Sequence, residues 1–498
     1  MNVNSPLGYS SAVVTRLVAM RREMEDLERQ FGSGIKATTY GGLGSERSLA
    51  ISFRSQIESI KTYQQSIDLL DTRLKTATGT LQHMQDIVTE TRSAFDPNKF
   101  DLLADGVTVQ QKTAKSAMVE FLGLLNSEVA GRYMFGGRQT DKPPVKSFDE
   151  IMDGNGGRAG FRQVMEERRQ ADLGTGNGRL ASSIAGADVT LAEDGVHPFG
   201  FKLQPATSTL SNATVSAPAG SPPSLTVSFT GQPSPGEVLR LTLTQPDGST
   251  TQVELKAAGA NDFDNGLFAI GATPADTAQN LKDALDDRLA YAASTDLTAA
   301  SAAEASENFF AAFGGVAPKR VAGPPFASAT ALVDGTPANT VSWYVGDDTP
   351  TTGARAEVQS KVDSAVSVSY GMRANEEAFS WHLRQFAVMT AVDLSGGGTT
   401  EKALHSSLAT KLKANLANPP GTQTLTAVHM EIALAQTAAK SADERHTLNE
   451  STLQGYLNDT EGVDKNEVAV KLLSLQTSMQ SSYQAASMLY KLSLTNFL

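Results

Sequence analysis

The 498-residue sequence has no cysteine, few aromatic residues and no long apolar run. Without cysteine, the chain can form no disulfide, no thiolate nucleophile and no Cys-ligated zinc site. Aromatic residues make up 6% of the sequence, which suits long helices and open β domains better than one thick core. No window approaches about 18 uninterrupted apolar residues, so the sequence predicts no transmembrane helix.

The sequence also lacks a positive charge balance. Its formal net charge is -12 and its pI is about 5.1. A general basic surface for nucleic acid is therefore not expected, and an anionic membrane surface would repel the chain. The first residues, MNVNSPLGYSSAVVTRLVAM, contain no basic segment followed by an apolar one, so we expect no cleavable Sec-type signal peptide. We expect neither nucleic acid nor a membrane as a partner.

Motifs that would indicate an enzyme are missing as well. The six histidines show no HExxH and no short His-x-His spacing, and the sequence contains neither GxSxG nor the Gly-Lys of a phosphate-binding loop. The glycine-rich stretch DGNGGRAG (153–160) does not follow an apolar strand, as a dinucleotide-binding fingerprint must. We therefore expect no catalytic residue, no cofactor and no metal site. His446 falls within an apolar helical pattern, where we expect a satisfied polar position.

The strongest pattern present is a heptad repeat between about Ser45 and Phe95. Apolar residues recur every seven positions, and a second set follows three positions later. This spacing predicts a long helix with coiled-coil-like packing, which Asp96-Pro97-Asn98 ends. A shorter amphipathic helix is predicted for 11–31, and another is predicted to end near Val129. The residues expected to pack in the long seam are Phe53, Ile60, Ile67, Leu74, Leu81 and Val88.

A matching apolar pattern returns in the last third of the chain. It runs from Thr424, weakens through His446 and Asn449, and resumes at Val468. The simplest arrangement is that the two terminal segments pack on each other as antiparallel helices. The final residues carry more apolar area than one partner helix needs, and we expect the surplus to be buried between subunits. The residues expected to pack there are Leu472, Leu475, Met479, Leu489, Leu492, Leu494 and Phe497.

The middle of the chain has a different character. Heptads disappear, and Gly, Pro, Ser and Thr increase. The segment EVLRLTLTQPDGSTTQVEL (237–255) alternates apolar and polar residues around Pro246-Asp247-Gly248, which predicts a β-hairpin. Thr273 and Pro274 predict a capped helix start. We therefore predict a multi-domain α+β fold, mostly α at both termini with a β-rich insertion, divided at 1–140, 141–365 and 366–498.

Three segments carry a resemblance to a known family. Residues 467–498, which end in LSLTNFL, resemble the C-terminal helix of flagellins and of the flagellar hook–filament junction protein. EVAGRYMFGGRQTDKPPV (128–145) is similar to the segment after the third N-terminal helix of junction-type members. Residues 33–57 occupy the place of the family's N-terminal stretch, although TTYGGLGSE (38–46) replaces the usual Asp-Asp-Pro-type turn. The resemblance covers a little over half of the chain.

The resemblance implies a self-assembling, non-enzymatic subunit of the bacterial flagellum, with terminal helices in an inner tube and the middle facing outward. It implies an extracellular location and export through the flagellar type III channel. The implied partners are other copies, neighbouring hook-associated proteins, a filament cap and an export chaperone that holds the C-terminal helix. The choice between filament subunit and junction ring stays open. Alternatives are a secreted fibre or phage-tail-like coiled-coil protein, and a flagellin-type scaffold with an inserted enzymatic domain.

Overall fold

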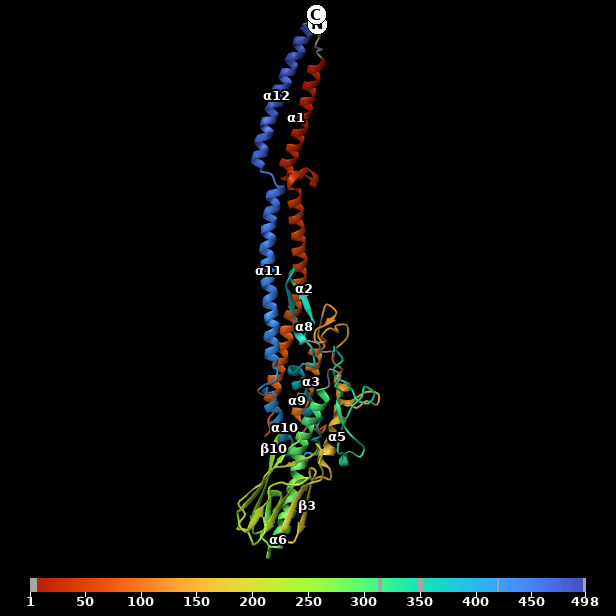
Figure 1. Cartoon of the computed structure of the whole chain (residues 1–498), viewed down its shortest axis with the longest axis vertical. Helices are drawn as coiled ribbons and strands as arrows, with labels where there is room; N and C mark the ends of the chain where they lie inside the picture. The colour runs from red at the N-terminus through yellow and green to blue at the C-terminus, as the bar shows by residue number, and fades with distance from the viewer. Residues whose placement is uncertain (1–6, 312–315, 348–352, 419–420, 496–498) are drawn as a thin grey trace. The chain divides into compact units, whose positions relative to one another are not determined.

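The computed structural model describes residues 7–311, 316–347, 353–418 and 421–495, and side chains between 12 and 488 within those ranges. These residues form a mixed α+β fold, as the sequence predicts (Figure 1). The chain divides into two compact units. The first comprises 1–71, 361–367 and 437–498, and the second comprises 72–360 and 368–436. Each unit combines stretches from different parts of the chain, so the units do not test the predicted division into three consecutive segments at 140 and 365, which stays a prediction.

The helices account for most of the ordered backbone. They are α1 (Leu7–Ser33), α2 (Arg47–Ala94), α3 (Val109–Leu125), α4 (Phe148–Asp153), α5 (Phe161–Leu173), α6 (Pro274–Ala292), α7 (Thr298–Phe310), α8 (Ala354–Glu357), α9 (Glu377–Ala391), α10 (Thr399–Asn415), α11 (Leu425–Glu461) and α12 (Lys465–Thr495). The predicted long helix over 45–95 is confirmed by α2, and the predicted capped helix by α6. The helix expected to end near Val129 ends at Leu125 instead, because Asn126 caps it and the chain turns into a short strand.

The strands are short and belong to several small sheets. They are β1 (Glu128–Val129), β2 (Arg132–Tyr133), β3 (Leu180–Ala185), β4 (Asp188–Glu193), β5 (Lys202–Leu203), β6 (Thr207–Ser208), β7 (Ala213–Val215), β8 (Ser224–Phe229), β9 (Val238–Thr244), β10 (Thr250–Ala258), β11 (Leu267–Ala269), β12 (Lys319–Val321), β13 (Leu332–Asp334), β14 (Gln359–Lys361) and β15 (Ser367–Ser369). The predicted hairpin is confirmed by β9 and β10, which pair antiparallel with Leu243 opposite Thr251. Gly248 supplies the left-handed backbone of the turn, with φ +76°.

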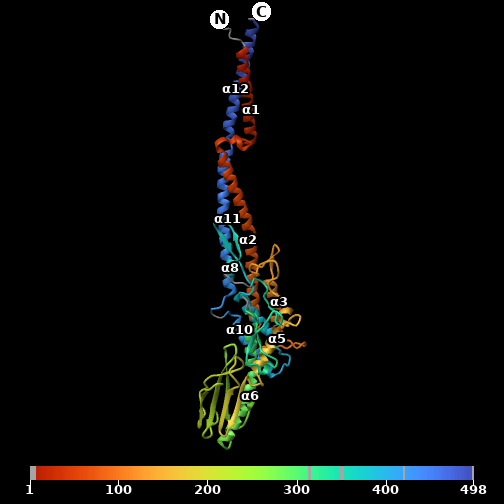
Figure 2. The ribbon, with the colours of Figure 1, turned by 45° about the vertical axis from the view of Figure 1, so that its right-hand side comes forward.

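The first unit is built from pairs of antiparallel helices. Helices α1 and α12 lie side by side, as both views show (Figures 1 and 2). The part of α2 in this unit runs antiparallel to the part of α11, because Arg54 contacts Glu461 and Gln64 contacts Thr447. His446 is buried on this seam, and its Nε2 contacts the carbonyl oxygen of Val362 at 2.8 Å. The prediction that His446 is a satisfied polar position is confirmed at Nε2 but not at Nδ1, which is buried without a partner among the described residues.

The second unit has an aromatic helical core and a β region with its own core. In the helical part, Phe121 of α3 packs edge to face on Phe386 of α9, with ring centroids 5.9 Å apart. In the β region, the sheet β3-β4-β8-β7 and the sheet β11-β10-β9-β5 share one apolar cluster with α6, which lies along the strands in Figure 2. Thr273 caps α6 with a capping box, and Pro274 occupies its first turn, as predicted.

The middle region contains more helix than the sequence indicates. Helices α4, α5 and α7 lie between 148 and 310 and were not predicted. Helix α5 buries polar side chains as well as apolar ones, and its Arg168 and Asp172 form an ion pair 2.8 Å apart. Helix α7 is mostly Ala, Ser and Glu with two phenylalanines at its end. Both segments do place apolar residues at helical spacing, such as Phe161, Val164 and Met165 in α5, but the pattern is short and interrupted by charged or small residues, so it gives a weak signal. No helix among the described residues is long and apolar enough to cross a membrane.

Candidate assembly surface

Helices α1 and α12 face each other through two heptad-spaced stripes. The α1 stripe has gaps of four and three residues, and the α12 stripe repeats the same spacing. The Oγ of Ser482 lies 4.0 Å from the Sδ of Met20, which fixes the two stripes opposite each other. Most of these side chains are only half-buried, because each helix covers just one side of the other. The stripes comprise Val13, Leu17, Met20, Met24 and Leu27 on α1, and Val468, Leu472, Leu475, Met479, Ser482 and Ala486 on α12.

Helix α12 carries apolar residues on its opposite face too. Val470, Leu473 and Met488 are 67%, 65% and 64% exposed. Val470 and Met488 are 18 positions apart, which is about five full turns of an α-helix, so they lie on one side. Leu473 is about 60° away around the helix axis, on the side that turns away from Leu472 and Met479. This set of three residues is termed the outer face of α12.

The outer face is unusual for exposed helix surface. Single exposed apolar side chains are common on soluble proteins, whereas several on one side of a helix make that side a candidate contact surface. Helix α1 adds Val14 and Val18, which are also exposed on its flank. Within this unit α11 exposes Leu448. Nothing among the described residues of the chain covers these side chains.

The predicted seam of α2 has a different outcome. Its residues are buried within the chain itself, from half-buried Phe53 to Leu74 and Leu81, which are fully buried. Ile60, Ile67 and Val88 are buried as well. The apolar side chains at these positions are therefore already buried within a single chain, and their part in assembly stays a prediction.

The predicted positions at the C-terminus are only partly described. Leu472 and Leu475 are half-buried and Met479 is buried, all on the side of α12 that faces α1. The side chains of Leu489, Leu492 and Leu494 lie outside the described residues, and so does Phe497 altogether. The sequence predicts an amphipathic helix over 11–31, which α1 confirms, but it did not single out the residues of the α1 stripe or the outer face of α12. Apolar residues 18 positions apart, such as Val470 and Met488, would have been the sequence signal for the outer face of α12.

The connections at the base of the α1–α12 pair are tightly bonded. Lys36 donates its backbone N–H to the carbonyl oxygen of Glu461 at 2.7 Å, and Val463 donates to that of Gly34 at 3.1 Å. The guanidinium of Arg54 donates twice to the Glu461 carboxylate, at 3.0 and 2.6 Å. This carboxylate raises the pKa of Arg54 above its usual value. The segment 38–46 is therefore flanked on both sides by bonds to the end of α11 and the residues that follow it.

The GRYMFGG segment forms a compact hairpin in the second unit. Ala130 and Gly131 make its turn, both with positive φ, between β1 and β2. Phe135 is fully buried edge to face on Phe379 of α9, with ring centroids 5.3 Å apart. A Cβ on Gly136 would lie 2.0 Å from the carbonyl oxygen of Gln139, so no larger residue fits there. The motif therefore has a structural role in this chain.

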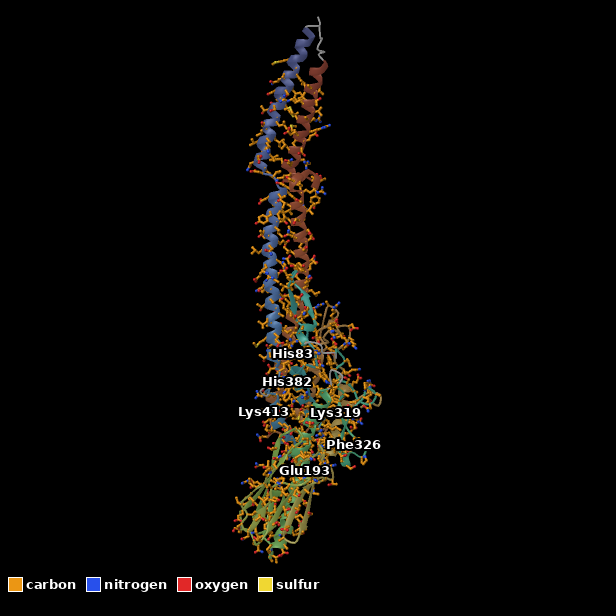
Figure 3. The ribbon with its side chains drawn as sticks, viewed as in Figure 1. His83, Glu193, Lys319, Phe326, His382 and Lys413 are labelled. Carbon is orange, nitrogen blue, oxygen red and sulfur yellow. The ribbon has the colours of Figure 1, made fainter. Side chains whose placement is uncertain are left out.

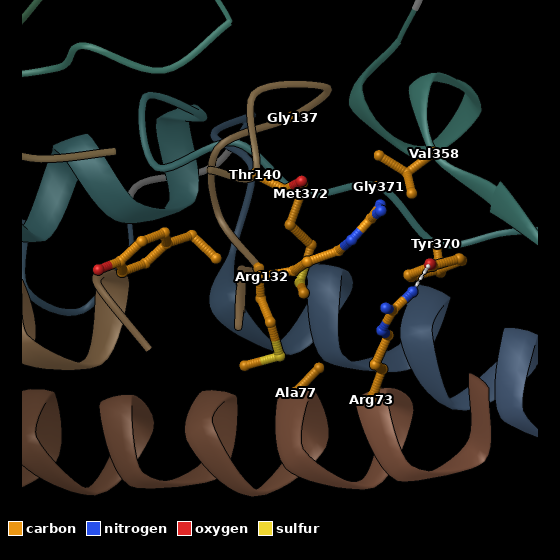
Figure 4. A pocket seen from close by; sticks show the side chains of 11 residues that line it. Arg73, Ala77, Arg132, Gly137, Thr140, Val358, Tyr370, Gly371 and Met372 are labelled. Carbon is orange, nitrogen blue, oxygen red and sulfur yellow. Dashed lines mark hydrogen bonds between the residues drawn. The ribbon is translucent and has the colours of Figure 1, made fainter. Parts of the chain in front are cut away.

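A small cavity of about 50 Å³ separates this hairpin from α2 (Figure 4). Arg73 and Ala77 of α2 line it together with Arg132 and Met372. Arg73 donates a hydrogen bond to the hydroxyl of Tyr370 at 2.9 Å, drawn as a dashed line in Figure 4. Such a volume holds a water molecule or two and no larger ligand.

Ion pairs hold the segment that follows the hairpin. Arg138 lies 2.5 Å from Asp347, and Arg373 lies 3.5 Å from Glu357. The carboxylate of Glu357 accepts no hydrogen bond from the described residues, and burial raises its pKa.

Among the described residues, no three His, Asp or Glu side chains gather as metal ligands would. Neither models of known protein families nor curated proteins give a match to the chain.

Proposed function

We propose that the chain is a structural subunit of the bacterial flagellar axial structure, which assembles through its terminal helices into the filament or the hook–filament junction and so contributes to motility. The observation that carries the proposal is the α1–α12 pair, which has apolar residues on two sides of α12 and covers only one of them. The resemblance of 128–145 and 467–498 to flagellins and the junction protein supports it.

The α1–α12 pair is only two helices thick. Two helices can bury one stripe each, which leaves the outer face of α12 in water. Burying such side chains is favourable by roughly 1.5–3 kcal/mol for each fully buried Val, Leu or Met. Equivalent helices of further copies would provide the cover, and a head-to-tail contact that does not close into a ring gives a helical tube.

The same surface accounts for the partners that the resemblance implies. Before assembly, the outer face of α12 would be an aggregation hazard during export, and a chaperone bound to this helix would shield it. After export, neighbouring copies or hook-associated proteins would replace the chaperone. Each of these partners would use the outer face of α12, formed by Val470, Leu473 and Met488.

The location is tested by immunogold electron microscopy of a cell that expresses the protein. Antibodies raised against the β region, 180–297, would label the flagellum along its length for a filament subunit and at one point for a junction protein. Deletion of the gene would remove the labelled part and motility together. Labelling of a fibre that is not a flagellum would instead favour the secreted-fibre alternative and contradict the flagellar assignment.

A further inference from the structure

The outer face of α12 contains one side chain that an oxidant can change. Met488 is 64% exposed and lies on the same side of the helix as Val470. Figure 3 shows side chains projecting from α12 on the side away from α1. The hydrocarbon side chains of Val470 and Leu473 resist mild oxidants, whereas the thioether of methionine is converted to a sulfoxide. The polarity of this face therefore depends on the redox state of Met488.

Exposure separates Met488 from most other methionines of the chain. Among the described residues, only Met430 of α11 is exposed to a similar degree, at 62%. The other described methionines are half-buried, as are Met20, Met24 and Met134, or buried, as are Met84, Met118, Met152, Met165, Met372, Met389 and Met479. Because oxidation of a thioether requires access to the sulfur, an oxidant in solution reaches Met430 and Met488 first.

The reaction is a two-electron oxidation by a peroxide. A lone pair of the Met488 sulfur attacks one oxygen of hydrogen peroxide, so that an S–O bond forms and the O–O bond breaks. After proton transfer, the second oxygen leaves as water. The sulfur is oxidised and the peroxide is reduced, and no further reactant is needed. The product is a polar sulfoxide in place of a flexible apolar side chain.

The sulfoxide would interfere with a contact at the outer face in two ways. It removes the favourable burial that the apolar side chain of Met488 offers to a neighbour. It also brings a strong hydrogen-bond acceptor into an apolar contact, where an acceptor without a donor is unfavourable. The other two residues of the outer face, Val470 and Leu473, have no polar atoms in their side chains that could satisfy it.

Packing alone explains why a methionine occurs at this position. Methionine is a good helix former, and its flexible side chain adapts to irregular contact surfaces. This structural role is compatible with a redox role, because the side chain that packs in its reduced form is the one that oxidation makes polar. The two roles differ in what they predict for oxidised protein, and that difference is measurable.

We propose that Met488 is a peroxide-sensitive modification site, and that its oxidation to the sulfoxide blocks assembly at the outer face of α12. This inference rests on the proposed function, because it takes the outer face as a contact between copies of the chain. The protection runs in the other direction as well. A side chain that a neighbouring copy covers is closed to the oxidant, so the assembled protein keeps Met488 reduced.

The test compares untreated and peroxide-treated full-length monomer. Mass spectrometry of proteolytic peptides fixes a dose of hydrogen peroxide that oxidises Met430 and Met488 and spares the half-buried and buried methionines. The critical concentration is then measured as the protein left in the supernatant after centrifugation of assembled samples. Oxidation should raise it by about 10-fold or more, since most of the burial of Met488 is lost. Methionine sulfoxide reductase with a thiol reductant should reverse the effect.

Matched variants assign the effect to one sulfur. Met488→Leu keeps an apolar side chain without a thioether, so its own critical concentration should not change on peroxide treatment. Met430→Leu removes the other exposed thioether, and its critical concentration should rise on treatment as that of the wild type does. Met488→Gln introduces a polar side chain of similar length and should raise the critical concentration without any oxidant.

Assembled protein provides a second readout. With free methionine in the same sample as the dose reference, Met488 should oxidise several-fold more slowly in the polymer than in the monomer. The inference is overturned if oxidised wild type assembles as the untreated protein does, if treatment impairs Met488→Leu as much as wild type, or if Met488 oxidises equally fast in both states. Failure of the untreated wild type to assemble would refute the proposed function itself, and this inference with it.

Discussion

The exposed valine on the outer face of α12 permits a quantitative test of assembly. Val470 is 67% exposed in the single chain, so Val470→Ser should leave the monomer's fold and stability almost unchanged. Valine and serine also have similar helix propensities, which removes a second source of change. If neighbouring copies cover this face, the substitution removes favourable burial only in the polymer.

The magnitude follows from the exposed fraction. Complete burial of a valine side chain is worth about 1.5 kcal/mol or more, and about two-thirds of that remains to be gained at Val470. The loss per subunit added is therefore about 1 kcal/mol, which raises the critical concentration for assembly roughly fivefold. Adding Leu473→Ser should multiply the effect, to about 20- to 50-fold for the double variant.

The assay is the concentration of unassembled protein that remains in the supernatant after centrifugation at steady state. Val196→Ser is the matched control, because Val196 is 77% exposed but lies between β4 and β5, outside the terminal helices. The control should leave the critical concentration unchanged. Equal effects of Val470→Ser and Val196→Ser, or no effect of the double variant, would refute the assignment of the outer face to assembly.

Three further predictions concern the second unit, whose unfolding both tryptophans report by fluorescence. Leu81→Ala, at a fully buried seam position, should lower the free energy of unfolding in urea by about 2–5 kcal/mol, whereas half-exposed Leu103→Ala should cost less than about 1 kcal/mol. The free energy of unfolding of this unit should fall as the pH is lowered from 6.5 to 4. The reason is that His382 takes up a proton near pH 6.5 in the unfolded state but only near pH 4 in the folded state. The loss from this group is about 2 kcal/mol at pH 5, and a His382→Phe variant that retains that part of the acid sensitivity would contradict it. Gly136→Ala should destabilise the unit by more than about 2 kcal/mol because its Cβ would overlap a carbonyl oxygen, while Gly79→Ala, where the Cβ meets nothing within 4 Å, should be neutral or stabilising.

Features that depend on local sequence were predictable. The α2 helix follows from heptad spacing, the β9–β10 hairpin from alternation around a Pro-Asp-Gly turn, and the start of α6 from Thr273 and Pro274. Each signal lies within a few residues of the structure it causes. The pairing of the terminal helices was predictable as well, because their apolar stripes match.

Features that depend on distant segments were not predictable. Helix α5 forms the Arg320–Glu167 ion pair, which joins residues 153 positions apart. The outer face of α12 was missed because its residues lie off the heptad pattern.

The central claim is that the chain forms a helical polymer through its terminal helices. Negative-stain electron microscopy of the purified full-length chain, at high concentration with a salt precipitant, tests it most directly. We expect helically ordered fibres, or short stacked rings for a junction protein, with α1 and α12 protected from protease only after assembly. A compact monomer at every concentration, with α1 and α12 already resistant to protease, would contradict it.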